Sequence, residues 1–88
     1  MVEVNDEIVI ASINSKNYPP GIVKCYLNWR GRVKSSERQR LLRESERLRT
    51  SARWSARLNR AYRVIFEWLD DNNIVVIGVT NHKYNNYV

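Results

Sequence analysis

The stretch that spans residues 54–68, WSARLNRAYRVIFEW, restricts the fold of this 88-residue chain more than any other. Apolar and polar residues alternate on both sides of its centre, as in two strands that each bury one face. A three-residue loop over 59–61 would pair Ala56 with Val64 and place all the apolar side chains on one face. A two-residue loop would instead place an arginine among them, and burying an unpaired arginine is costly. The stretch therefore predicts an antiparallel hairpin with the three-residue loop.

The same register places Arg57 directly opposite Arg63 on the other face of the hairpin. Like charges on directly opposed strand positions repel each other and destabilise the pair. An anion bound between the two guanidinium groups would explain the arrangement, and the planar arginine fork suits phosphate. The alternative is that Glu67, on the same face as Arg63, neutralises the charge from within. The anion site is the interpretation that we favour.

Positive charge is concentrated in the middle of the chain. The segment 24–63 holds 13 Lys and Arg residues against 3 acidic ones, whereas the rest holds 2 basic and 6 acidic residues. Such a concentration is typical of a polyanion binder. Since arginine also favours helices, a solvated helix face is the alternative explanation. The charge pattern thus predicts contact with nucleic acid or with the ribosome.

Composition restricts the class of protein. Hydrophobic residues make up 43% of the chain, enough for one compact core, so we expect a single domain over residues 1–88. The longest apolar run, 74–77, is far too short to span a membrane, and the N-terminus lacks an apolar signal region. Cys25 is the only cysteine, so no internal disulfide can form, and together with His82 it cannot make a structural zinc site. We expect a cytoplasmic protein without metal, cofactor or membrane association.

The N-terminal half is expected to contain one strand and two helices. The run EIVIASI, residues 7–13, predicts a first strand. Two prolines then precede apolar residues at helical spacing over 20–33. Ser36, with a glutamine three residues on, resembles a capping box, so a second helix is expected to start there and continue through 37–49. Its apolar stripe is thin, which predicts a position on the surface.

The C-terminal half is expected to supply three strands, over 52–59, 61–69 and 73–82. The sequence DDNN at 70–73 is a turn signal between the last two. The last strand is apolar on both faces, as in a covered interior strand. The predicted fold is therefore α+β: an N-terminal strand, two helices, and a three-strand antiparallel segment that completes one small sheet.

These residues resemble the RelE/ParE superfamily of bacterial toxins, and most of all its HigB-type members. The sheet of such toxins commonly reads Trp-Ser-x-Arg-x-Asn-x-x-Tyr-Arg-x-x-Phe-x-Trp, followed by a strand that ends in a polar, often His-containing segment. The close match covers residues 54–82, about a third of the chain. The matching positions are Trp54, Ser55, Arg57, Asn59, Tyr62, Arg63, Phe66 and Trp68.

The resemblance implies a toxin that cleaves messenger RNA, usually on the ribosome, and that an antitoxin holds inactive. It assigns Arg63 to the strand that faces the RNA and Arg57 to a basic position on the neighbouring strand. His82 falls where members carry a functional His or Arg, and Tyr84 and Tyr87 lie near a family tyrosine without a spacing that selects one. We expect the antitoxin to cover the basic helices with an acidic segment.

Metal-free RNA cleavage needs a base near the 2′-hydroxyl, cations around the phosphorus, and a proton for the leaving oxygen. Histidine titrates near neutral pH, so His82 is a reasonable acid or base, while Glu67 could be the base or only an ion-pair partner of Arg63. Two other functions remain open: a nucleic-acid-binding module without catalysis, and a ParE-like inhibitor of DNA gyrase. The candidate catalytic residues are Arg63, His82, Glu67 and Tyr84, and the candidate RNA-binding residues are Arg57, Arg60, Lys83, Arg53 and Tyr87; Arg60 and Lys83 could equally be ordinary loop charges.

Overall fold

The structure is a computed structural model that describes residues 1–15, 18–49 and 52–81. Within these residues the chain is a small α+β protein with one five-stranded mixed sheet and three helices. None of the described helices combines the length and the apolar composition that a membrane-spanning segment needs. In chain order the elements are β1 (Glu3–Asn5), α1 (Glu7–Ser15), α2 (Pro20–Lys34), α3 (Arg38–Arg43), β2 (Ser45–Arg47), β3 (Arg53–Arg57), β4 (Arg63–Trp68) and β5 (Asn73–Thr80).

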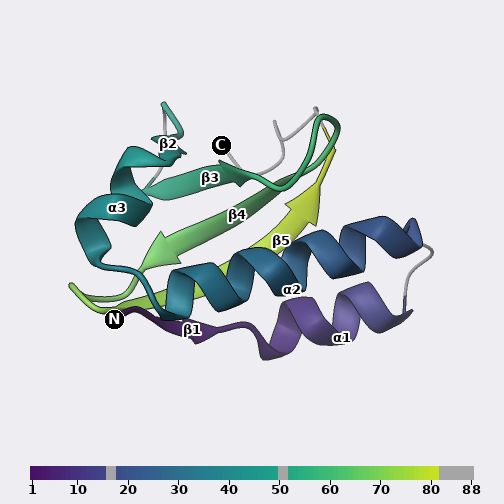
Figure 1. Cartoon of the computed structure of the whole chain (residues 1–88), viewed down its shortest axis with the longest axis horizontal. Helices are drawn as coiled ribbons and strands as arrows, with labels where there is room; N and C mark the ends of the chain where they lie inside the picture. Colours follow the sequence, from purple (N-terminus) through teal and green to yellow (C-terminus); the bar gives the residue numbers. More distant parts are fainter. Residues whose placement is uncertain (16–17, 50–51, 82–88) are drawn as a thin grey trace.

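The strands lie in the order β1-β5-β4-β3-β2 (Figure 1). The predicted antiparallel segment is present as β3, β4 and β5, and β2 extends it antiparallel to β3. The N-terminal strand, however, pairs parallel with β5, which makes the sheet mixed. Two parallel neighbouring strands need a long connection. Here that connection contains all the other elements of the chain, from α1 to β4.

The hairpin of β3 and β4 has the predicted register. Ala56 pairs with Val64, Arg57 pairs with Arg63, and the Trp54–Phe66 pair follows. The Asn59 side chain stabilises the loop, because its Oδ1 accepts hydrogen bonds from the backbone N–H groups of residues 61 and 62, each at 2.8 Å. An asparagine that bonds to the backbone two residues on is a common turn former.

The prediction of a strand over 7–13 is wrong, since this segment lies in α1. Val9 and Ile13, four residues apart, are buried against the sheet, whereas Ile8 is 77% exposed. A short apolar run fits both the helical and the strand period, so periodicity alone does not separate them. The N-terminal strand is instead β1, Glu3–Asn5, which comes before α1 in the chain.

The second helix is much shorter than predicted. It spans only Arg38–Arg43, and Ser45–Arg47 forms the edge strand β2. Leu41 anchors the helix, but the positions three and four residues later are Glu44 and Ser45, so the apolar stripe of a longer helix would be interrupted before Leu48. Nor does Ser36 form the expected capping box, because its hydroxyl donates to the carbonyl of Arg32 at the end of α2. The helix over 20–33 is confirmed as α2.

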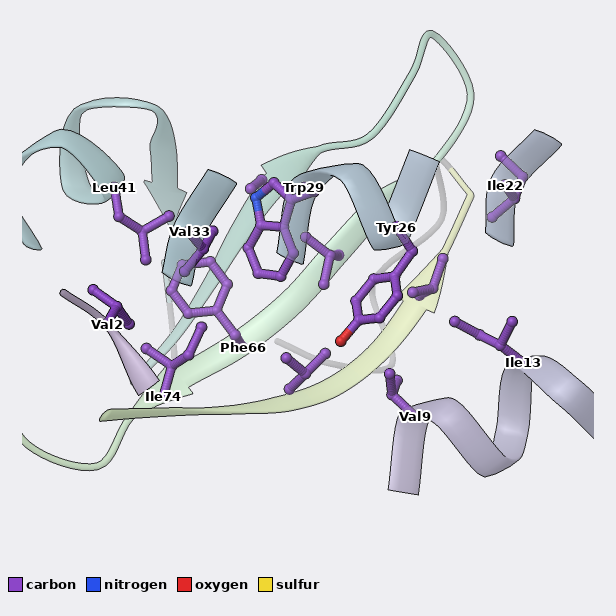
Figure 2. Packing of buried hydrophobic residues seen from close by; sticks show 14 residues of the cluster. Val2, Val9, Ile13, Ile22, Tyr26, Trp29, Val33, Leu41, Phe66 and Ile74 are labelled. Atoms are coloured by element: carbon purple, nitrogen blue, oxygen red, sulfur yellow. The ribbon is translucent and has the colours of Figure 1, made fainter. Parts of the chain in front are cut away.

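All three helices pack on one face of the sheet. In Figure 2 Trp29 of α2 lies between Phe66 of β4 and Tyr26 of α2, and Val9 and Ile13 of α1 lie on the side of Tyr26. The Trp29 ring centre lies 5.8 Å from that of Phe66 and 5.9 Å from that of Tyr26. None of the described helices packs on the other face, where polar side chains of β3 and β4 surround the buried Ile65.

A buried polar cluster joins the start of α1 to α2. The Tyr26 hydroxyl and Arg30 Nε both donate a hydrogen bond to Asp6 Oδ2, and each donor–acceptor distance is 2.6 Å. Tyr26 is fully buried and Asp6 is 6% exposed. Burial, and then the hydrogen bond to Asp6, raise the pKa of Tyr26 well above its usual value, while the carboxylate of Asp6 raises the pKa of Arg30. The cluster therefore holds Tyr26 in its neutral form and Arg30 in its charged form.

The raised pKa of Tyr26 predicts a loss of stability in alkali. Above the ordinary tyrosine pKa of 10.0 the unfolded chain releases a proton that the folded chain retains, so the free energy of unfolding falls as the pH rises. This one group should contribute a slope of about 1.4 kcal/mol per pH unit above pH 10, and none below it. Urea unfolding at several pH values should show the slope in the native chain and a shallower one in Tyr26→Phe. Equal slopes would contradict the assignment.

Candidate nucleic-acid interface

The candidate interface lies on the sheet face opposite the helices. Side chains alternate between the faces of a strand, so the residues that flank the core positions Trp54 and Ala56 point away from α2. Ile65 confirms the separation of the faces, because it is fully buried and yet is not part of the helix-side cluster. The side chains of β2, β3 and β4 that share this face are Arg53, Ser55 and Arg57 of β3, Arg63, Ile65 and Glu67 of β4, and Glu46 of β2.

Arg63 occupies the centre of this group. Its Nε donates to Ser55 Oγ at 2.7 Å, and its Nη2 lies 3.6 Å from Glu46 Oε2. The Ser55 side chain is fully buried, that of Arg63 is 21% exposed, and that of Glu46 is 66% exposed. The Arg63 guanidinium is thus held from the side of its Nε, while its contact with Glu46 lies near solvent.

Glu67 forms its ion pair with Arg53 instead of Arg63. The two residues are direct cross-strand partners, with 3.3 Å between Arg53 Nε and Glu67 Oε2 and both side chains 33% exposed. The idea that Glu67 is the ion-pair partner of Arg63 is therefore wrong. Neutralisation from within does occur on this face, through Glu67 for Arg53 and through Glu46 for Arg63.

Arg57 differs from the other two arginines. It is exposed, lies directly across from Arg63, and makes no ion pair with any residue in the described ranges. Counted over the shared face, three arginines meet two glutamates, which leaves one positive charge in excess. Arg60 is also exposed, in the loop that joins β3 to β4. The positive end of the interface is therefore the end of the hairpin near Arg57.

Four predicted site residues, His82, Lys83, Tyr84 and Tyr87, lie outside the described residues. The last strand ends at Thr80, which is the cross-strand partner of Arg63. The described part of the chain therefore ends beside the candidate interface.

Two polar residues of this face, Glu46 and Ser55, were not among the candidates that the sequence indicated. Glu46 was assigned to a helix, and only the pairing of β2 with β3 brings it to the arginines. Ser55 occupies an outward position of an alternating strand, where serine is usually a solvent-facing residue. The signal that could have identified Ser55 is its place two positions from Arg57 on the face that the register assigns to the arginines.

The described residues also form a hollow of about 410 Å³ at the other edge of the sheet, where β1 leads into α1. Arg30 is the cation among its lining residues, and it is committed to Asp6. Among the residues that the structure describes, no three His, Cys, Asp or Glu side chains come together as a metal site would require.

Comparison of the chain with models of known protein families gave no match, and comparisons with curated proteins and with solved structures gave none either.

Proposed function

We propose that this chain is the toxin of a toxin–antitoxin pair of the RelE/ParE type, a metal-independent endoribonuclease that cleaves messenger RNA on the ribosome in the cytoplasm. The observation that supports this proposal is the direct pairing of Arg57 and Arg63 on the sheet face opposite the helices. Two arginines paired across neighbouring strands can hold a phosphate, and they occupy the positions that the resemblance assigns to RNA contact.

The reaction moves the 2′-oxygen of the RNA onto the adjacent phosphorus, a base takes the proton of the 2′-hydroxyl, and the bond from phosphorus to the 5′-oxygen breaks. The leaving 5′-oxygen takes a proton from a general acid, for which His82 stays the candidate. Negative charge accumulates on the phosphoryl oxygens in the transition state, where fixed cations are most effective. Arg63, whose side chain is 21% exposed, supplies one of these cations. Arg57, exposed at the end of the hairpin, supplies a second cation that can follow the backbone of the RNA.

Two carboxylates on this face are candidates for the base that takes the proton of the 2′-hydroxyl. Glu67 is bound to Arg53, and its side chain is 33% exposed. Glu46 lies beside Arg63, and its side chain is 66% exposed, so it can reach a phosphate bound to Arg63 more readily. We therefore assign the base to Glu46 in preference to Glu67.

Glu46→Gln and Glu67→Gln provide a matched test of this assignment, because each variant removes one charge and retains the shape of the side chain. Loss of a general base lowers the rate by about 100- to 10,000-fold, so kcat of Glu46→Gln should fall within that range. The rate of Glu67→Gln should fall less than about ten-fold, since the change affects only the position of Arg53. Single-turnover cleavage of a labelled RNA measures both, and the reverse order of effects would exchange the two roles.

Purified protein incubated with RNA, in the presence and absence of ribosomes, tests the proposed function itself. We expect cleavage in the presence of ribosomes, and growth arrest on expression that Arg63→Ala relieves. Arrest without cleavage would indicate a gyrase inhibitor on the same fold. RNA binding without either arrest or cleavage would indicate a non-catalytic binding module.

The proposed antitoxin is an acidic protein. Helix α2 contains four basic residues and no acidic one, and three of these, Lys24, Arg32 and Lys34, are exposed. An acidic segment lying along α2 would be complementary to this charge. Co-expression with an adjacent small acidic protein should yield a stable complex that dissociates at high salt, and failure of every such neighbour to bind would remove this part of the proposal.

A further inference from the structure

Ser55 is a buried polar residue for which the proposed mechanism does not account by itself. Its side chain has no exposed surface and lies between Glu46 of β2 and Ile65 of β4. A buried hydroxyl is unfavourable unless it has a hydrogen-bond partner, and β-branched apolar residues fit a strand better than serine. Here the hydroxyl accepts a hydrogen bond of 2.7 Å from Arg63 Nε.

We propose that Ser55 is a positioning residue, whose hydroxyl holds the guanidinium plane of Arg63 in the orientation that recognises a phosphate. This inference rests on the proposed function, in which Arg63 contacts the scissile phosphate. Nε is the donor nearest the backbone, and a hydrogen bond there orients the plane of the two terminal amino groups. Those terminal groups are the ones that match two phosphate oxygens at once.

The reason that orientation matters is entropic. An arginine side chain has many rotamers, and ordering it at the moment of binding lowers the affinity or the rate. In the folded chain the hydrogen bond to Ser55 already orders Arg63. The distance of 3.6 Å between Arg63 Nη2 and Glu46 Oε2 is long for a hydrogen bond, so a phosphate can compete with this carboxylate.

Arg57 provides the contrast within the same face. It lies directly across from Arg63 but is exposed and forms no ion pair with a described residue. An arginine without such a support can attract the RNA backbone but does not impose an orientation on it. Ser55 should therefore influence kcat, through the geometry of Arg63, more than KM.

The first test does not depend on catalysis. NMR of the full chain with ¹⁵N-labelled arginine should show a distinct Nε–H signal for Arg63 that exchanges slowly with water. In Ser55→Ala this signal should exchange about ten-fold faster, as expected for loss of one hydrogen bond to a charged group, while the backbone spectrum is retained. An unchanged exchange rate would overturn the inference, whether or not the protein cleaves RNA.

The second test is kinetic. Ser55→Ala should lower kcat about 10- to 100-fold and change KM less than about three-fold, as expected for a misplaced catalytic group. Thr and Val have nearly the same shape, but only Thr has a hydroxyl. The kcat of Ser55→Thr should therefore stay near the native value, whereas the kcat of Ser55→Val should fall as in Ser55→Ala. In an Arg63→Ala background, Ser55→Ala should have no further effect on kcat, because its influence passes through Arg63.

Equal kcat values for Ser55→Thr and Ser55→Val, or a further loss of kcat in the Arg63→Ala background, would contradict a positioning role. If the native chain cleaves no RNA, the proposed function fails, and the NMR experiment alone then decides whether Ser55 orients Arg63.

Discussion

Replacing Arg63 with alanine is expected to lower the rate of RNA cleavage about 100- to 1,000-fold, the usual effect of removing one preorganised donor from a transition state. Arg63 lies at the centre of the candidate interface, where Ser55 and Glu46 hold its guanidinium and Arg57 lies directly across. The loss should appear in kcat, since the charge that Arg63 meets is greatest in the transition state. Single-turnover cleavage with native protein and variant measures it.

Arg32→Ala is the matched control for this prediction. Arg32 is exposed on α2, which packs on the opposite face of the sheet, and its replacement removes the same charge. Its rate should stay within about three-fold of the native rate, because an exposed charge far from the reacting atoms acts only through screened electrostatics. If Arg32→Ala and Arg63→Ala reduce cleavage equally, total charge controls the activity and the arginine pair is not its centre.

Asp6→Ala is expected to cause the largest loss of stability of any single change considered, about 3 kcal/mol. Asp6 Oδ2 accepts hydrogen bonds from Tyr26 and Arg30, and its removal leaves the fully buried Tyr26 hydroxyl without that partner. Arg30 is one-third exposed, so water compensates for part of its loss. For a domain of this size the melting temperature should fall by about 12–24 °C. Thermal unfolding followed by circular dichroism measures the shift.

Asp71→Ala tests whether the effect of Asp6 comes from burial and not from the loss of a carboxylate. Asp71 also pairs with an arginine, Arg38, at 3.4 Å, but its side chain is 91% exposed. Exposed ion pairs contribute little, so the free energy of unfolding should change by less than about 0.5 kcal/mol. A loss for Asp6→Ala no larger than that for Asp71→Ala would show that the cluster does not stabilise the junction of α1 and α2.

Local rules on the sequence were sufficient for the hairpin of β3 and β4. The pairing of Arg57 with Arg63 follows from the alternation around Ala56 and Val64 and from the loop length. A shift of one residue would bury the arginines and expose the rings, so only one register is consistent with the pattern. The helix over 20–33 could also be predicted from the sequence, because its buried residues recur at a regular helical spacing and a proline begins it.

Tertiary structure alone decided the elements whose sequence fits two states. The run 7–13 can be a strand or a helix, and it is a helix because Val9 and Ile13 find a place against β5. The segment 45–47 is rich in charge and has no strand pattern of its own. It becomes β2 because the edge of β3 offers backbone hydrogen-bond partners there.

The partners of the arginines depend on that same edge. Glu46 reaches Arg63 only because β2 pairs with β3, and Glu67 is bound to Arg53 because these two residues are directly opposed. The sequence by itself thus determined which arginines share a face, because alternation along a strand is a local property. The tertiary fold decided which carboxylates contact these arginines. The reason is that strand pairing brings together segments that are distant in the sequence, and the local pattern of one segment does not indicate its partner.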